Sequence, residues 1–438
     1  MRKEDSVFCA NLGYRWGDVG PDSDVDGVLC MASAIDMASA VRRDLQAGDV
    51  SAVLFDPQVY MAGLPFEDSE KTCARLATYP WFPVEVADYE SGEMTRRDWL
   101  GEVTSEMGAE WPPALPTTEE GTLALVRSAI DFQSDFGVTH VILPAPLISE
   151  PDSDLAEALL WVDAGLEASQ DVKTPILATL AVSDVCLLRD GSEANPILSI
   201  AVDQLSARPE LSGVYVVLEQ SRGEFRGPIH RQVCRSLLTL SHVLGEECRL
   251  HVFVNFAAEF GLACLGAGAK SFASGYENKC RRLHLPDFVQ RGGGGAFPRF
   301  VSLGCLCEYL PGTDLERIRD RRLLRLLQND RTLAGAPLLD ALQAGRSADN
   351  VVGWRESRNN VAEARRHYLQ RLSAAARQLA SMEAADRARI VYQLLQDAER
   401  DSAYLDSIFQ GDPLWESGTH VGVWRAAYED FLGSYDLA

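Results

Sequence analysis

Eight short apolar runs, separated by segments with helical patterning, recur between residues 7 and 275. They occupy residues 7–10, 28–31, 52–55, 141–143, 176–178, 214–218, 252–254 and 271–273. Continuous apolar runs are typical of strands that are buried on both faces, and intervening helices are what parallel connections require. Eight such units predict a (β/α)8 barrel of the TIM type, whose functional residues lie at the carboxyl ends of the strands.

The 438 residues are enough for a barrel and a second region. We expect the barrel over 1–310, with a lid-like insertion at about 63–116 that is rich in Pro and Trp and lies over the barrel mouth. Residues 311–438 are expected to be α-helical. Within them Val361, Tyr368, Leu372, Leu379 and Met382 fall on one helical face.

Charge is distributed unevenly along the chain. The net charge is −24 over residues 1–278 and +1 over residues 279–438, where 21 of the 22 cationic residues are Arg. The barrel should therefore repel a phosphate backbone at long range, whereas the C-terminal part should not. The ten scattered cysteines favour reduced core thiols. With neither a signal-like N-terminus nor a membrane-spanning apolar stretch, we expect a cytoplasmic protein without membrane partners.

Polar residues follow several of the runs and are candidates for the site: Asp56, Pro144, Asp184, Glu219, Asn255 and Ser274. Asp56 and Glu219 are the predicted catalytic residues, because a carboxylate that ends a buried strand is costly unless it is paired or used. They would act as an acid and base pair or anchor a ribose or base. The alternative for these positions is helix capping. Asn255 could donate to a ligand carbonyl.

A predicted phosphate-binding site surrounds the glycine run at 292–295. Lys279, Arg281, Arg282 and Arg299 flank that run, together with Arg291. Glycine-rich backbone flanked by cations can hold phosphate groups. The alternative is an ordinary solvated loop, since the sequence matches neither standard nucleotide-binding glycine motif.

Four residues have the types and order of zinc ligands: Cys280, His284, Cys305 and Cys307. However, Cys-x-Cys is less specific than Cys-x-x-Cys, and the neighbouring leucines suit buried thiols. We therefore expect no metal and no cofactor, and these four residues are the candidates if zinc is bound.

The segment from Glu259 to Gly275, the Arg-rich stretch that leads to Cys305 and Cys307, and the helical C-terminal region together resemble the tRNA-guanine transglycosylase-like barrel superfamily. The resemblance covers roughly residues 1–400. Two features depart from the family pattern. Ala273 or Ser274 stands where the family has the Asp that attacks the ribose, and no cysteine follows Cys307.

The resemblance implies a pocket for a (deaza)purine base or a nucleic acid, in a base-modification or phage-defence context. Substrate binding would fall to Asn255, Glu259, Ser274 and Tyr276. Base exchange of the glycosyltransferase class would lack its usual nucleophile. Asp56 and Glu219 would then bind the polar edge of the base.

Two other hypotheses remain open. The chain could be a non-catalytic subunit of a multiprotein complex or a homodimer, with the tail residues Trp415 and Trp424 exposed for contact. It could instead be a small-molecule barrel enzyme of another reaction class, in which Asp56 and Glu219 form the acid and base pair.

Overall fold

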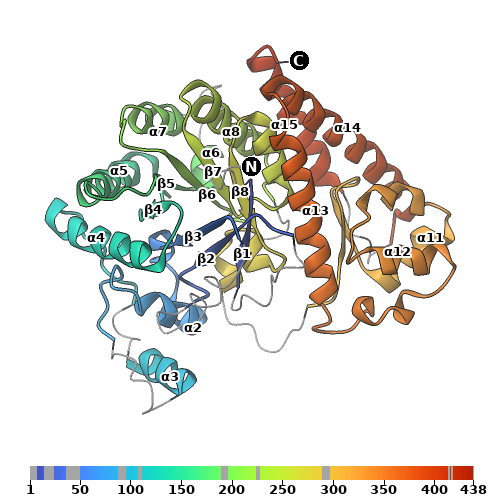
Figure 1. Cartoon of the computed structure of the whole chain (residues 1–438), viewed down its shortest axis with the longest axis horizontal. Coiled ribbons are helices and arrows are strands. Elements are labelled where there is room, and N and C mark those ends of the chain that lie inside the picture. The colour runs from blue at the N-terminus through green and yellow to red at the C-terminus, as the bar shows by residue number, and fades with distance from the viewer. Residues whose placement is uncertain are drawn as a thin grey trace.

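The computed structural model describes residues 7–13, 24–35, 50–86, 95–106, 111–188, 196–222, 227–288, 296–412, 415 and 418–437. Within them, eight parallel strands form a nearly closed barrel (Figure 1). The strands are β1 (Phe8–Leu12), β2 (Gly27–Met31), β3 (Ala52–Asp56), β4 (Val141–Leu143), β5 (Ile176–Ser183), β6 (Gly213–Glu219), β7 (His251–Asn255) and β8 (Ser271–Ser274). Each overlaps one predicted apolar run, so the predicted (β/α)8 fold is confirmed.

The barrel has one seam. The strands are hydrogen-bonded in the order β3-β2-β1-β8-β7-β6-β5-β4, so β3 and β4 are the two edges that meet. Thr139 joins them just before β4, because its backbone N–H and its hydroxyl both donate to the carbonyl oxygen of Val53, at 2.8 and 3.1 Å. One backbone carbonyl on the edge of β3 thereby accepts hydrogen bonds, although β3 and β4 are not paired as neighbouring strands.

Strand alternation decides which side chains face the barrel interior. Asn11 on β1, Tyr215 on β6 and Asn255 on β7 are joined by hydrogen bonds inside the barrel. Glu219 lies four residues beyond Tyr215 on the same strand, so it shares that inward face. Residues of the other parity, such as Phe8 and Phe272 with ring centres 5.0 Å apart, pack on the outer side.

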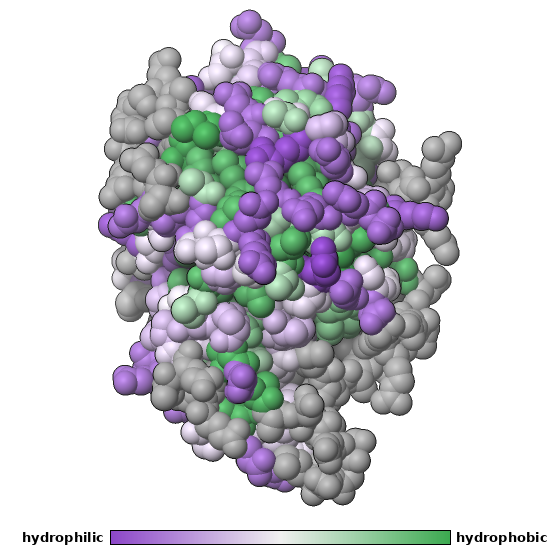
Figure 2. All heavy atoms as spheres, turned by 90° about the vertical axis from the view of Figure 1, so that its left-hand side faces the viewer, coloured by the Kyte–Doolittle hydropathy of each residue, from purple (hydrophilic) through white to green (hydrophobic). Residues whose placement is uncertain are grey.

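Helices cover the outside of the barrel between successive strands. They are α4 (Glu119–Phe136), α5 (Pro151–Ala168), α6 (Asp184–Leu188), α7 (Pro196–Ser206), α8 (Arg231–His242) and α9 (Gly261–Ala267). Helix α4 shows how the sequence sets the two ends of a helix. The Thr118 hydroxyl caps its start, and Gly137 ends it with φ +83°. Figure 2 shows the side of the molecule that lies on the left in Figure 1, where hydrophilic residues surround smaller apolar groups.

The insertion packs partly on the outer face of β3. It contains α2 (Phe66–Ala77) and α3 (Arg96–Glu106). Between these helices, Tyr79 and Trp81 contact the outward-facing Phe55, with ring centres 5.5 and 6.0 Å away, and Phe132 of α4 completes the cluster at 4.8 Å. The Trp81 indole also donates to the carbonyl oxygen of Pro57 at 3.0 Å. This aromatic cluster anchors the insertion beside the tip of β3.

The C-terminal region begins with a short antiparallel hairpin, which the sequence analysis did not predict, and continues as helices. The short helix α10 (Asn278–Arg281) lies between β8 and this hairpin. The elements of the C-terminal region are β9 (Phe300–Ser302), β10 (Cys307–Tyr309), α11 (Glu316–Asp320), α12 (Ala336–Gln343), α13 (Ala362–Ala380), α14 (Ala384–Phe409) and α15 (Thr419–Ser434). The predicted apolar face is real, since Tyr368, Leu372 and Leu379 of α13 are all buried.

Helix α13 serves as an outer helix of the barrel itself. It packs against β1 and α9, and the hydroxyl groups of Tyr368 and Ser274 are hydrogen-bonded at 2.7 Å. At its other end, Arg377 binds Asp24 and Asp26 just before β2, at 2.9 and 2.8 Å. Helices α14 and α15 in turn pack on α9 and α8 (Figure 1). The C-terminal helices therefore complete the barrel's outer layer.

The expectation that Trp415 and Trp424 are exposed is wrong. Trp424 is 2% exposed, and its indole donates to the carbonyl oxygen of Pro228 at 2.7 Å. Trp415 is partly buried and stacks on Phe409, with ring centres 4.3 Å apart. An amphipathic sequence indicates that a helix has an apolar face but not what that face contacts. In the structure α15 packs on α8, an outer helix of the barrel.

No helix in the described part of the chain is both long enough and apolar enough to cross a membrane.

Candidate functional site

Asp56, at the carboxyl end of β3, is enclosed by hydrogen-bond donors. It is 1% exposed. The hydroxyls of Tyr60 and Tyr215 donate to its Oδ2 at 2.5 and 2.7 Å, and the backbone N–H of Gln58 donates to its Oδ1 at 3.1 Å. The Asn255 amide adds a longer contact to Oδ2 at 3.3 Å. Both carboxylate oxygens of Asp56 are therefore occupied by the protein's own groups.

Two asparagines extend this network to β1 and β7. The Asn255 amide also donates to the Tyr215 hydroxyl at 2.5 Å, and its Oδ1 accepts from Asn11 at 2.8 Å. Asn11 further donates to the carbonyl oxygen of Cys280 at 2.6 Å. The network therefore joins strands β1, β3, β6 and β7 and the segment after β8. The buried Oδ1 of Asn11 has no hydrogen-bond partner in the described structure, whereas the other bonds of this network hold the strand tips in one arrangement.

Burial raises the pKa of Asp56 to about 6, and the hydrogen bonds from Tyr215, Tyr60, Gln58 and Asn255 limit the rise. Burial and the nearby Asp56 charge raise the pKa of Tyr60 and Tyr215 well above their ordinary value, so both phenols stay protonated and keep donating. Asp56 can hold or release a proton near neutral pH, and each of its two oxygens already accepts a hydrogen bond from the chain.

Glu219, the second predicted catalytic residue, lies in a separate cluster at the tips of β5 and β6. Its Oε2 accepts from the Ser183 hydroxyl at 2.7 Å. Asp184 follows Ser183 directly and starts α6, where its Oδ2 accepts from the backbone N–H of Ser221 at 3.1 Å. The other Asp184 oxygen, Oδ1, is buried and has no hydrogen-bond partner in the described structure. This cluster therefore keeps acceptor capacity.

The chain after β8 lies alongside Glu219. Glu219 and Leu283 form a parallel bridge, and the backbone N–H of Gln220 donates to the carbonyl oxygen of Leu283 at 2.8 Å. His284 Nδ1 lies 2.7 Å from the carbonyl oxygen of Gln220. Burial is the main cause that raises the pKa of Glu219; the Asp184 charge adds to it, whereas the Ser183 hydrogen bond and His284 oppose it. Glu219 is therefore a carboxyl group prepared to exchange a proton.

The other predicted substrate-binding residues form a third group beside β8. Ser274 turns outward to Tyr368, so Ala273 is the inward-facing residue near the end of β8. The Tyr276 hydroxyl accepts from the backbone N–H of Arg299 at 2.9 Å. Glu259 is buried, with Oε1 3.9 Å from Arg281. The structure does not bring these residues into the Asp56 network, which includes only Asn255 of the predicted substrate-binding set.

The predicted phosphate-binding residues contact acids and aromatic rings of the chain. Arg281 is buried, pairs with Glu308 and lies with its guanidinium carbon 4.2 Å from the centre of the Tyr368 ring. Arg282 pairs with Asp287 at 2.8 Å. Lys279 lies over the Phe288 ring, 5.3 Å from its centre, and Arg299 is 4.0 Å from Glu308. The glycine run and Arg291 lie outside the described residues.

The four zinc candidates do not form one cluster in the described structure. Among the described side chains, no group of three His, Cys, Asp or Glu residues could hold a metal ion. Burial raises the pKa of the Cys305 thiol to about 12, which disfavours the thiolate that zinc needs. His284 lies against the Gln220 carbonyl, as described above.

Sequence reasoning missed the groups that surround the two carboxyls. Tyr215 lies inside the predicted strand 214–218 and Asn11 directly follows the predicted strand 7–10, so a polar residue within or at the end of an apolar run was the available signal. Tyr60 follows Asp56 by four residues, within the short turn Val59–Met61. Ser183 had no signal of its own, because its relation to Glu219 depends on the register between β5 and β6.

Comparisons with known proteins add little to this description. No protein-family model matches the chain, and no curated protein matches it in sequence. Among solved structures, the chain is similar to dihydrodipicolinate synthase from Oceanobacillus iheyensis, with 12% identity and a TM-score of 0.28. That alignment covers 85% of this chain and 97% of the synthase chain.

Proposed function

We propose that this protein is a barrel enzyme that binds a small molecule with adjacent N–H donors, of the guanine-like purine class, and that Glu219 exchanges a proton with it. The supporting observation is the Glu219 and Asp184 carboxyl pair, in which a buried Asp184 oxygen has no hydrogen-bond partner in the described structure. A buried acceptor without a donor is costly, and a ligand N–H would satisfy it.

Guanine matches this pair because its N1–H and N2 amine are neighbouring donors on one edge. A carboxylate can accept both at once, whereas adenine presents an acceptor at N1. Charge favours a neutral base or nucleoside over a polynucleotide, since residues 1–278 carry a net charge of −24. This proposal keeps the base recognition that the transglycosylase resemblance implies. It does not use a β8 nucleophile, because Ala273 faces inward there.

The two catalytic candidates take different roles in this proposal. Asp56 is a positioning residue, because its oxygens are filled by Tyr60, Tyr215, Gln58 and Asn255. Glu219 is on the same inward face as Tyr215, so the Asp56 network fixes the strand that carries it. Proton transfer falls to Glu219, because burial raises the pKa of its carboxyl above the ordinary value.

The test is calorimetric titration of the full-length protein with guanosine, inosine and adenosine. We expect affinity to fall in that order, because inosine lacks the N2 amine and adenosine also lacks N1–H. Glu219→Gln should weaken guanosine binding by about 10- to 100-fold, the effect of losing hydrogen bonds to a charged acceptor. Glu157→Gln is the matched control, since Glu157 lies on α5 outside the barrel and also has a raised pKa.

The pH dependence gives a second readout. The carboxylate form of Glu219 accepts a ligand N–H beside the Asp184 oxygen that lacks a partner in the described structure, so guanosine affinity should rise with pH through the raised pKa of Glu219 and then level off. The Glu219→Gln protein should show no such rise. Equal affinities for guanosine and adenosine, or unchanged binding by Glu219→Gln, would refute the proposal.

A further inference from the structure

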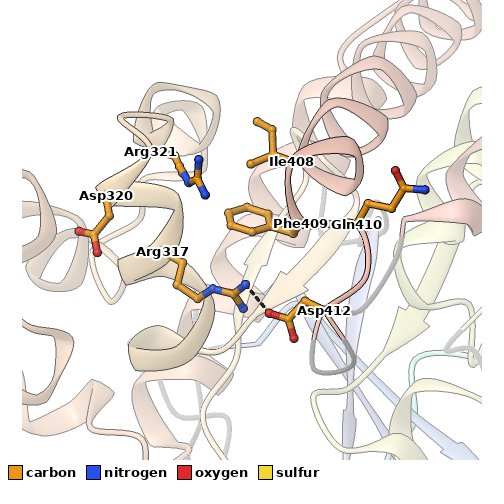
Figure 3. A pocket seen from close by; sticks show the side chains of 7 residues that line it. All are labelled: Arg317, Asp320, Arg321, Ile408, Phe409, Gln410 and Asp412. Atoms are coloured by element: carbon orange, nitrogen blue, oxygen red, sulfur yellow. Dashed lines mark ion pairs between the residues drawn. The ribbon is translucent and has the colours of Figure 1, made fainter.

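A cavity of about 310 Å³ lies in the C-terminal region, between the end of α11 and the end of α14 (Figure 3). It is lined by Arg317, Asp320, Arg321, Ile408, Phe409, Gln410 and Asp412. All of these residues lie outside the (β/α)8 strands, so the cavity is separate from the Glu219 site. Its volume is at the lower end of the range for small-molecule sites.

The Phe409 ring forms one wall of the cavity and is contacted by two neighbouring side chains. Trp415 stacks on the Phe409 ring with centres 4.3 Å apart. The guanidinium carbon of Arg317 lies over the same ring, 4.9 Å from its centre, and Arg317 forms an ion pair with Asp412. These contacts fix the orientation of the Phe409 ring beside the cavity. The Arg317 charge is already neutralised by Asp412.

Arg321 is the cation that remains available in this cavity. It is exposed, and within the described ranges its side chain has neither an ion-pair nor a hydrogen-bond partner. Figure 3 shows its guanidinium on the same side of the Phe409 ring as Ile408, whereas the Asp320 carboxylate points away. Asp320 is bound by Arg319 at 2.8 Å. An anion placed between Arg321 and Ile408 would therefore meet a cation without displacing an existing partner.

The local charge favours the same kind of ligand. Residues 316–325 contain five arginines and two acids, in a chain whose net charge is −23. A guanidinium presents a rigid fork of N–H donors that matches the oxygens of a phosphate or carboxylate group. Ile408 and Phe409 lie next to that fork, so an apolar group attached to the anion would also be covered.

We propose that this cavity binds a small organic oxyanion, with Arg321 holding the phosphate or carboxylate group and Ile408 contacting the attached apolar part. The site is independent of the proposed purine site, and either can fail without the other. It is a binding site on the outer region rather than a second reaction centre, since the lining contains no His, Cys or Ser.

Titration calorimetry with the full-length protein tests this site, using phenyl phosphate, benzoate and inorganic phosphate as probes. We expect phenyl phosphate or benzoate to bind more tightly than inorganic phosphate, and the better of the two identifies the preferred oxyanion. Arg321→Gln should weaken that binding at least about tenfold, because hydrogen bonds to a charged group are lost. Arg322→Gln is the matched control: Arg322 is an exposed neighbour outside the cavity lining and should change affinity less than about twofold.

Three results would overturn the proposal. The first is no binding of any probe below about 10 mM. The second is any sign of a diffuse charged surface. Such a sign would be equal loss of affinity in Arg321→Gln and Arg322→Gln, or an affinity for inorganic phosphate equal to that for phenyl phosphate. The third is tight binding of a single-stranded oligouridylate that both variants weaken equally, which would assign the arginines to a nucleic acid instead.

Discussion

Replacement of Asp56 by Asn should change how the protein's stability depends on pH. The pKa of Asp56 is about 6 in the folded protein and near its ordinary value of 3.8 in the unfolded chain. Below 3.8 both states hold the proton. Between the two values the unfolded chain has lost the proton while the folded protein keeps it, so the free energy of unfolding falls as pH rises. Above pH 6 both states have lost the proton, so the decrease in the free energy of unfolding stays constant.

The size of the effect follows from the two pKa values. Their separation corresponds to about 3 kcal/mol of lost stability at high pH. About half of that, on the order of 1–2 kcal/mol, develops between pH 5 and pH 8, because part of the change has already occurred below pH 5. This range stays above the isoelectric point of about 4.7. An asparagine side chain has no titrating proton, so the Asp56→Asn protein lacks this component.

The assay is urea unfolding of the wild type and Asp56→Asn at several pH values from 5 to 8, followed by tryptophan fluorescence. The wild-type free energy of unfolding minus that of the variant should fall by about 1–2 kcal/mol across the range. Asp131→Asn, on the exposed side of α4, controls for loss of one negative charge and should give a constant difference. A constant difference for Asp56→Asn as well would show that burial does not raise this pKa.

Two further substitutions test the buried networks. Tyr215→Phe removes the hydroxyl that donates to Asp56 and accepts from Asn255, so the free energy of unfolding should fall by about 1–3 kcal/mol in urea; an unchanged midpoint would contradict the network. Arg281→Leu removes the buried guanidinium that pairs with Glu308 and leaves the more distant Arg299 beside that carboxyl, so it should cost about 3–5 kcal/mol, measured by the same unfolding curves. A variant as stable as the wild type would mean that the pair is dispensable.

The barrel could be predicted from the sequence because its signal is local. Each strand is a short apolar run, and the run that contains Phe55 shows the pattern of a strand buried on both faces. The packing of the C-terminal helices could not be predicted in the same way. Tyr368 indicates an amphipathic helix, but only the fold reveals that its buried face rests on β8 and Ser274.

The candidate site was predictable to the level of individual carboxyls and no further. Asp56 and Glu219 could be identified because each ends an apolar run. Their roles depend on partners that lie far away in the sequence: Tyr215 is 159 residues from Asp56, and Ser183 is 36 residues from Glu219. Register and barrel closure decide those partners, and neither is encoded in a local pattern.

The position of α13 has a consequence for how the protein is made on the ribosome. The strand β1 leaves the ribosome early, but the helix α13 that packs on its outer side is made only after the hairpin and the arginine-rich stretch. Until then the outer side of β1 lacks this cover. A nascent chain that stalls before Ala362 would consequently be a chaperone client, although all eight barrel strands have already been synthesised.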